Sequence, residues 1–151
     1  MKNIKKKKGP LFQINNRQKK LTINLNQIKS AFDNNPDLFH PPPEEVGVVI
    51  VSDKTIRKLN KEFLNKDSTT DIISFKLSQR YGEIVISAET AFQNSRLYGK
   101  SLENEIIYLI IHGYLHLKNY KDYKPADKVQ MFKIQDSIFC SITGKDGDES
   151  T

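Results

Sequence analysis

Residues 110–122 read IIHGYLHLKNYKD, an apolar run that holds His112 and His116 four positions apart. At about 100° per residue, four helical steps return to within roughly 40° of the starting direction. Both imidazoles therefore project from one face of a predicted helix, one above the other. Two imidazoles in this arrangement can bind one divalent metal ion, and the carboxylate of Asp122 can reach the same ion from beyond the helix end.

The chemistry of these donors leaves two interpretations open. Histidine and carboxylate ligands favour Zn²⁺, and iron or nickel would also suit this donor set. Alternatively, the two histidines are core residues whose rings are satisfied by hydrogen bonds. A peptidase is disfavoured, because His-Glu-x-x-His proteases carry a glutamate as general base beside the first histidine. Gly113 occupies that position here.

Composition limits the class of protein. The chain has 151 residues, enough for one domain with a substantial core. No apolar run approaches the length of about 18 residues that spans a bilayer, so no membrane association is expected. The single cysteine, Cys140, excludes an internal disulfide and favours a reducing, cytoplasmic setting. Because Cys140 lies in an apolar helical pattern, we expect it to be buried.

The charge pattern points toward an anionic partner. The net charge is +6, which favours nucleic acid, although five lysines lie within the first eight residues. We expect a basic tail over residues 1–10, a single metal-binding catalytic domain over 11–143 and an acidic tail over 144–151. The protein is expected to be a monomer.

Apolar periodicity predicts a single α+β domain, with a small mixed sheet of about four strands packed by about five helices. Short β-branched runs predict strands over 11–14, 45–51, 70–75 and 83–86. Helical spacing predicts helices over 21–32, 53–64, 88–97, 102–118 and 125–139, three of which follow a serine suited to an N-cap. The helix over 102–118 is apolar on most sides, so it should run through the middle of the domain and carry both histidines.

Three blocks of the sequence resemble one known family. HGYLHL over 112–117 resembles the signature His-Gly-x-Leu-His-Leu of the YbeY family of rRNA maturation factors. LN at 59–60 with TDIISF over 70–75 is similar to that family's Leu-Asn and Thr-Asp-Val-Leu-Ser-Phe segments. GEIVI over 82–86 is similar to its Gly-Asp-Ile strand. The blocks follow the family's order within residues 45–140.

The resemblance implies a metal-dependent endoribonuclease that acts on single-stranded RNA and hydrolyses phosphodiesters with a zinc-activated water. It also implies maturation of small-subunit (16S) rRNA at its 3′ end and a role in ribosome assembly. His112 and His116 would act in catalysis through one zinc ion, with Asp122 as the third ligand. Ser74 and Asp71 are candidates for contact with substrate or with the ligands; alternatively, Ser74 bonds the backbone and Asp71 orders a loop.

Two departures from the family pattern bear on function, besides Asn119 in place of a glycine and Lys121 in place of an aspartate. Asparagine can also adopt the left-handed conformation expected at this helix end. Asp122 aligns with the family's third histidine, and Leu64 aligns with an arginine. If that arginine contacts phosphate, another cation must do so here, and Arg57, Lys61 and Lys66 are nearby in sequence. The departures favour an alternative, a non-catalytic ribosome-assembly factor with a structural metal that binds rRNA or a ribosomal protein. A three-ligand site with an open position favours catalysis.

Overall fold

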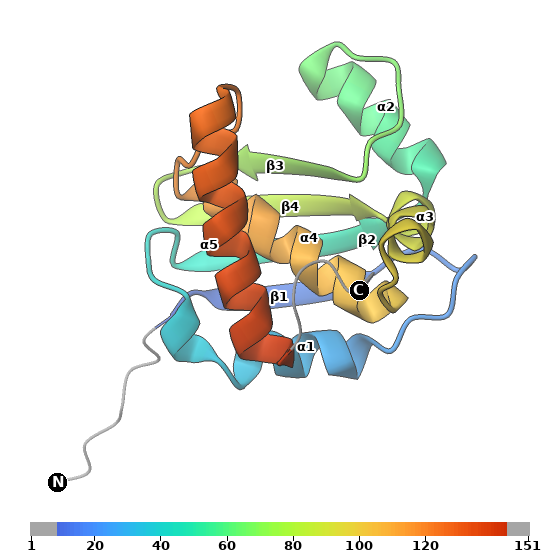
Figure 1. Ribbon diagram of the computed structural model, residues 1–151. Coiled ribbons are helices and arrows are strands. Elements are labelled where there is room, and N and C mark those ends of the chain that lie inside the picture. The colour runs from blue at the N-terminus through green and yellow to red at the C-terminus, as the bar shows by residue number, and fades with distance from the viewer. Residues whose placement is uncertain (1–8, 145–151) are drawn as a thin grey trace, which may run out of the picture.

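Residues 9–144, which the computed structural model describes, form four strands and five α-helices in mixed order (Figure 1). The elements are β1 (Leu11–Asn16), α1 (Leu25–Asp33), a short 3₁₀ helix (Pro36–Leu38), β2 (Glu45–Val51), α2 (Asp53–Leu64), β3 (Ile72–Lys76), β4 (Tyr81–Ser87), α3 (Ala88–Tyr98), α4 (Leu102–Leu117) and α5 (Pro125–Thr143). The predicted α+β class is therefore confirmed. The tails expected over 1–10 and 144–151 lie almost wholly outside the described residues.

The sheet is mixed and has the strand order β1-β2-β4-β3. β1, β2 and β4 run parallel, and β3 pairs antiparallel with β4 at one edge. β2 is apolar along most of its length because both of its faces are covered. Val48 faces the larger core, whereas Val51 belongs to the smaller core on the opposite face, with Ile56 of α2.

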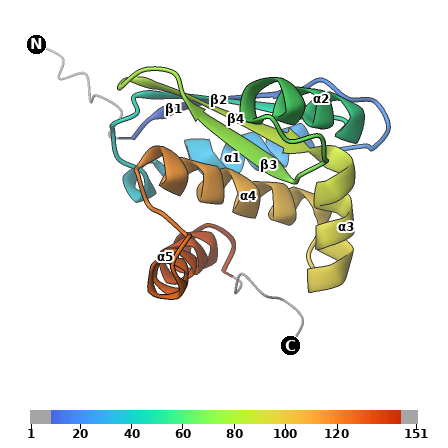
Figure 2. The ribbon, with the colours of Figure 1, turned by 90° about the horizontal axis from the view of Figure 1, so that it is seen from above.

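Helices cover the sheet in layers. α4 crosses one face with α1 beside it, and α5 packs on the outer side of α4, whereas α2 covers the other face (Figure 2). α4 is buried along most of its length, as predicted for a central helix. Even so, no helix in the described part of the chain is both long and apolar enough to cross a membrane.

Gly113 allows α4 to lie very close to the sheet. A Cβ atom at this position would stand 2.8 Å from Cδ1 of Ile84 and 3.1 Å from Cδ1 of Ile72. Both isoleucines belong to the sheet, so any larger side chain here would push α4 away from it. The glycine between the two histidines therefore sets how far their helix stands from β3 and β4.

Hydrogen bonds at helix starts explain where the predictions succeed and where one is wrong. The side chains of Ser52, Ser87 and Ser101 each accept a hydrogen bond from a backbone N–H three residues on, as expected for N-caps. The helix predicted over 21–32 instead begins at Leu25, because Asn24 is its N-cap. Gln18 Oε1 also accepts from the N–H of Leu21, which holds that residue outside the helix.

The prediction that Cys140 is buried is wrong, since this thiol is exposed. α5 packs through a stripe of residues four apart, Met131, Gln135 and Phe139. Cys140 follows Phe139 by one residue and is therefore rotated by about 100° away from this stripe. The first residues of the predicted strand 70–75 also differ, because β3 begins at Ile72.

Candidate metal centre

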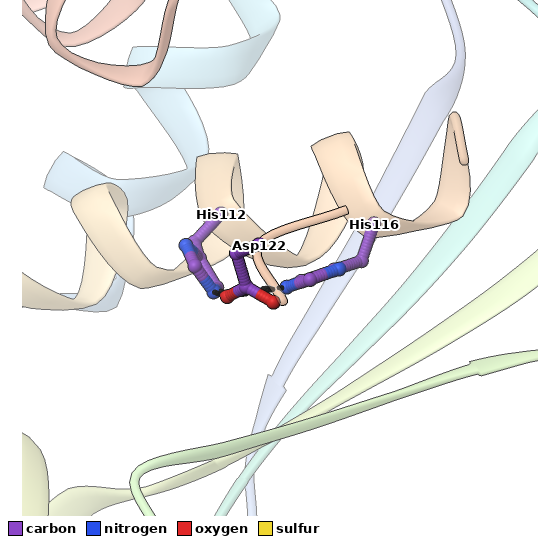
Figure 3. A group of neighbouring side chains, drawn as sticks. All are labelled: His112, His116 and Asp122. Atoms are coloured by element: carbon purple, nitrogen blue, oxygen red, sulfur yellow. Dashed lines mark hydrogen bonds and ion pairs between the residues drawn. The ribbon is translucent and has the colours of Figure 1, made fainter. Parts of the chain in front are cut away.

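Three side chains from α4 and the connection to α5 converge on one point (Figure 3). His112 and His116 project from the last two turns of α4, and their Nε2 atoms are 3.1 Å apart. Oδ2 of Asp122 lies 3.5 Å from Nε2 of His116 and 3.9 Å from Nε2 of His112. All three side chains are half-buried, so their ends remain open to solvent on one side. We call these three residues the triad.

Asp122 reaches the rings because the chain reverses tightly after α4. Asn119 adopts the left-handed conformation with φ 71°, as predicted, and its N–H donates to the carbonyl of His116. The N–H of Tyr120 donates to the carbonyl of Leu115 at 3.0 Å. These bonds satisfy the last carbonyls of the helix and turn the chain back along the face that carries the histidines.

Gln135 of α5 orients the first histidine. Nδ1 of His112 lies 3.0 Å from Oε1 of Gln135, while Nε2 of Gln135 donates to the carbonyl of Tyr108 at 3.2 Å. The second bond fixes the amide so that its oxygen faces the ring, which makes Nδ1 the protonated nitrogen. Nε2 of His112 then presents its lone pair toward the triad. Gln135 is only 1% exposed, so water does not compete for this bond.

The surroundings of the second histidine favour its neutral form. Burial lowers the pKa of His116 below its ordinary value, and the facing ring of His112 acts in the same direction. Asp122 and a hydrogen bond to the backbone of Tyr120 oppose this shift. A neutral imidazole is the form that binds a metal ion.

The donor set fits a divalent metal ion. The candidate ligand atoms all lie within 4.8 Å of one another. Two nitrogens bound tetrahedrally to one Zn²⁺ at about 2.0–2.1 Å would be about 3.3 Å apart, close to the spacing of the two Nε2 atoms. Two neutral imidazoles and one carboxylate are donors that zinc binds readily, and three protein ligands leave a fourth position open.

The triad lines an open hollow of about 530 Å³ between α4, β3 and the connection to α5. Ser74 lines this hollow from the middle of β3, and its hydroxyl makes no hydrogen bond within residues 9–144. Asp71 also lines it, and its Oδ2 accepts a hydrogen bond from Asn94 at 3.2 Å. Leu64, which the resemblance places where the family pattern has an arginine, lines the hollow as well.

Two residues near the triad were not predicted from the sequence. Lys76 is the only lysine or arginine that lines the hollow in the described part of the chain, and its Nζ donates to Oδ1 of Asn119 at 3.2 Å. Of the cations considered earlier, Arg57 is paired with Asp67 at 2.8 Å, and neither Lys61 nor Lys66 lines the hollow. A lysine that ends an edge strand carries no sequence signal of this role. Gln135 did have a sequence signal, because it is a polar residue within an apolar stripe.

Comparison with known proteins identifies the family of the chain. The sequence model of the family described as endoribonuclease YbeY matches residues 13–143. The endoribonuclease YbeY of Endomicrobium trichonymphae is 39% identical over 97 residues, covering 63% of this chain and 69% of the relative. That of Aquifex aeolicus is 38% identical over 107 residues, covering 67% and 71%.

A solved structure shares the fold. The solution structure of TM1509 from Thermotoga maritima superimposes with a TM-score of 0.65 over 89% of this chain and 90% of that one, at 24% identity. The fold and the triad define an α+β domain with a candidate metal site on its central helix. The chain belongs to the YbeY family, whose members are named endoribonucleases, that is, nucleases acting on RNA.

We predict that Gln135→Leu lowers the affinity for Zn²⁺ by about 10- to 100-fold, the usual effect of removing the partner of a ligating histidine. Leucine is similar in volume to glutamine and suits the apolar stripe of α5, so the fold should be retained. Competition titration with a chromophoric chelator measures the affinity. Gln130→Leu, an exposed position on the same helix, is the matched control and should bind as the unmodified protein does. Equal affinities for both variants would contradict the role of Gln135.

We also predict that the free energy of unfolding of the metal-free protein falls as the pH drops below about 6.5. The folded pKa of His116 is lowered, so the unfolded chain takes up a proton at a pH where the folded ring is still neutral. Stability is therefore lost as pH falls from the unfolded pKa toward the folded one. Urea unfolding at several pH values in a chelator measures this slope, which should be shallower in His116→Gln. Parallel curves would refute the prediction.

Proposed function

We propose that this protein is a metal-dependent endoribonuclease that cleaves single-stranded RNA. The observation that carries the proposal is the convergence in an open hollow of three side chains whose donor atoms could bind one metal ion. Membership of a family named for RNA cleavage supports the choice of substrate. The net charge of +6 favours binding to a polyanion.

The residues of the hollow have separate roles in this proposal. His112, His116 and Asp122 would hold one divalent metal ion, and Gln135 would keep His112 in the ligating tautomer. A bound divalent ion would polarise a phosphoryl oxygen and lower the pKa of a water molecule. Ser74, whose hydroxyl is uncommitted, would donate a hydrogen bond to the RNA backbone. Asp71, held by Asn94, would act through its position in the wall rather than as a base.

Lys76 supplies the phosphate contact in this proposal. Its ammonium group lies at the rim of the hollow, tethered to Asn119 in the turn that also positions Asp122. A lysine acts on phosphate as a point charge, whereas an arginine makes a planar two-pronged contact. Lys76 would therefore attract the phosphodiester without orienting it as strictly as the family's arginine would.

The biological setting is part of the same proposal. We infer that the resident metal is Zn²⁺, one per chain, since histidine and carboxylate donors suit it. The substrate would be rRNA of the small ribosomal subunit, cleaved near the 3′ end of 16S rRNA during ribosome assembly in the cytoplasm. The protein would act as a monomer, with a ribosomal protein as a further partner. Family membership is the support for these points.

One observation favours a second candidate function. Leu64 lines the hollow where the family carries an arginine, so only one cation faces the triad within the described residues. A non-catalytic assembly factor, with the metal in a structural role, would tolerate this loss. Such a protein would bind rRNA or a ribosomal protein without cleaving either.

The two functions are separated by a cleavage assay on single-stranded RNA with the purified full-length chain and added Zn²⁺. We expect cleavage that stops when a chelator is added. It should fall by more than about 100-fold in His116→Ala, because losing a metal ligand reduces activity more than losing a residue that only orients a ligand. His40→Ala, at an exposed position away from the triad, is the control. Cleavage that survives both the chelator and His116→Ala would refute the nuclease. Bound metal without cleavage would favour the assembly factor.

We further predict that Lys76→Ala slows cleavage by about ten-fold or more, since a hydrogen bond to a charged group is worth about 1.5–3 kcal/mol. The loss should appear mainly as weaker substrate binding, with reduced dependence on salt. Lys76→Arg should retain activity, and Lys29→Ala on α1, outside the hollow, is the matched charge control. Initial rates at several RNA and salt concentrations measure both effects. Equal losses in the Lys76 and Lys29 alanine variants would rule out a local phosphate contact.

A further inference from the structure

A second hollow adjoins the one that holds the triad. It has a volume of about 420 Å³, within the range of small-molecule sites, and lies between α3, α4, α5 and the start of β3. Asp71, Ile72 and His112 line both hollows. A molecule that occupies the second hollow would therefore lie directly beside the triad.

The walls of the second hollow offer flat apolar surfaces. Tyr98 of α3, Tyr108 of α4 and Phe132 of α5 all line it. The ring of Phe132 is centred 6.2 Å from the ring of His112 and is inclined to it by 34°. Aromatic side chains of this kind are the surfaces on which nucleobases stack.

The charges in this hollow disfavour phosphate. Its one cation within the described residues, Lys100, is buried against Glu105 at 3.2 Å, with both side chains no more than 3% exposed. Lys100 also lies over the ring of Tyr108, 4.3 Å from its centre. Two further carboxylates, Asp71 and Asp136, have no cation within 4.0 Å among residues 9–144. A phosphate group would be repelled here, unlike at the rim of the first hollow.

These two carboxylates are placed to accept hydrogen bonds. Oδ2 of Asp71 accepts from Asn94, and Oδ1 of Asp136 accepts from the hydroxyl of Tyr108 at 2.6 Å. The second oxygen of each carboxylate has no hydrogen bond within the described residues. A ligand with a flat face and N–H groups at its edge would satisfy both the walls and these oxygens. Nucleobases that carry an exocyclic amine have this chemistry.

We propose that the second hollow binds the base of the nucleotide next to the cleaved phosphodiester, and that it prefers bases with an exocyclic amine. The proposal rests on the proposed function, and it adds a base preference to that reaction. The phosphate of this nucleotide would lie at the triad and its base against Phe132, since Lys100 lies over the rings of Tyr98 and Tyr108. Asp136, at the open side of the hollow, would accept a hydrogen bond from the amine.

Matched nucleotides test this preference directly. Guanosine and inosine monophosphates differ only by the 2-amino group, and cytidine and uridine monophosphates exchange an amine for a carbonyl. Each is titrated into the ¹⁵N-labelled full-length chain in a chelator, with ribose 5-phosphate as the base-free probe, and amide shifts give Kd. We expect GMP to bind about ten-fold more tightly than IMP, and CMP more tightly than UMP. Shifts should map to α3, α5 and the start of β3.

A pair of variants assigns the effect to the hollow. Asp136→Asn should reduce the GMP-to-IMP ratio to less than about two-fold while leaving the binding of ribose 5-phosphate unchanged. Asp127→Asn, an acidic position on the same helix that does not line the hollow, is the control and should keep the full ratio. Because both changes conserve size, the amide spectrum also reports whether the fold is retained.

The outcomes distinguish this proposal from the nuclease itself. Equal binding of GMP and IMP, or of nucleotides and ribose 5-phosphate, would overturn the base site whether or not RNA is cleaved. Absence of saturable binding would overturn it as well. Amine-dependent binding that Asp136→Asn removes would support it even if the cleavage assay failed, in which case the nuclease alone would be refuted.

Discussion

The close approach of α4 to the sheet is the constraint from which the candidate site follows. Gly113 leaves no side chain between the helix and Ile84 or Ile72, so α4 is held at a short, fixed distance from β3 and β4. His112 and His116 lie one residue before and three residues after this glycine, so the same packing fixes their backbone positions. Close-packed interiors resist displacement. Two of the three candidate ligands are therefore preorganised by the core itself, and only Asp122 depends on a loop.

The surroundings of His112 divide into two regions of opposite character. On one side, the triad and Lys76 present metal-binding donors and a positive charge, which suit a phosphodiester. On the other side, aromatic rings and the carboxylate of Asp136 suit a neutral base with N–H donors, and Asp71 lies between the two regions. A nucleotide has the same two parts joined through a sugar. A nucleotide bound in this way would have one orientation, with its phosphate at the triad and its base in the second hollow. A metal site alone would not impose that orientation.

Local patterns in the sequence were enough to predict the fold and the triad. The β-branched run over 45–51 and the helix over 53–64 were found because hydrophobic period and serine caps act over a few residues. His112, His116 and Asp122 were found because they lie within eleven consecutive residues. Gln135 and Lys76 were missed because their proximity to the triad arises from the packing of α5 and β3 on α4. The burial of Cys140 was predicted wrongly because the sequence of a largely apolar helix does not indicate which stripe of residues faces the core.

The hydrogen bond between Gln135 and His112 has a consequence for the order in which the protein matures. All three candidate ligands precede Gln135 in the chain, so they emerge from the ribosome before it does. Until α5 has been synthesised and has docked on α4, the ring of His112 is free to exchange its proton between its two nitrogens. If the triad binds a metal ion, its full affinity would therefore be reached only after α5 has docked on α4, and a nascent chain interrupted before α5 would bind the ion more weakly.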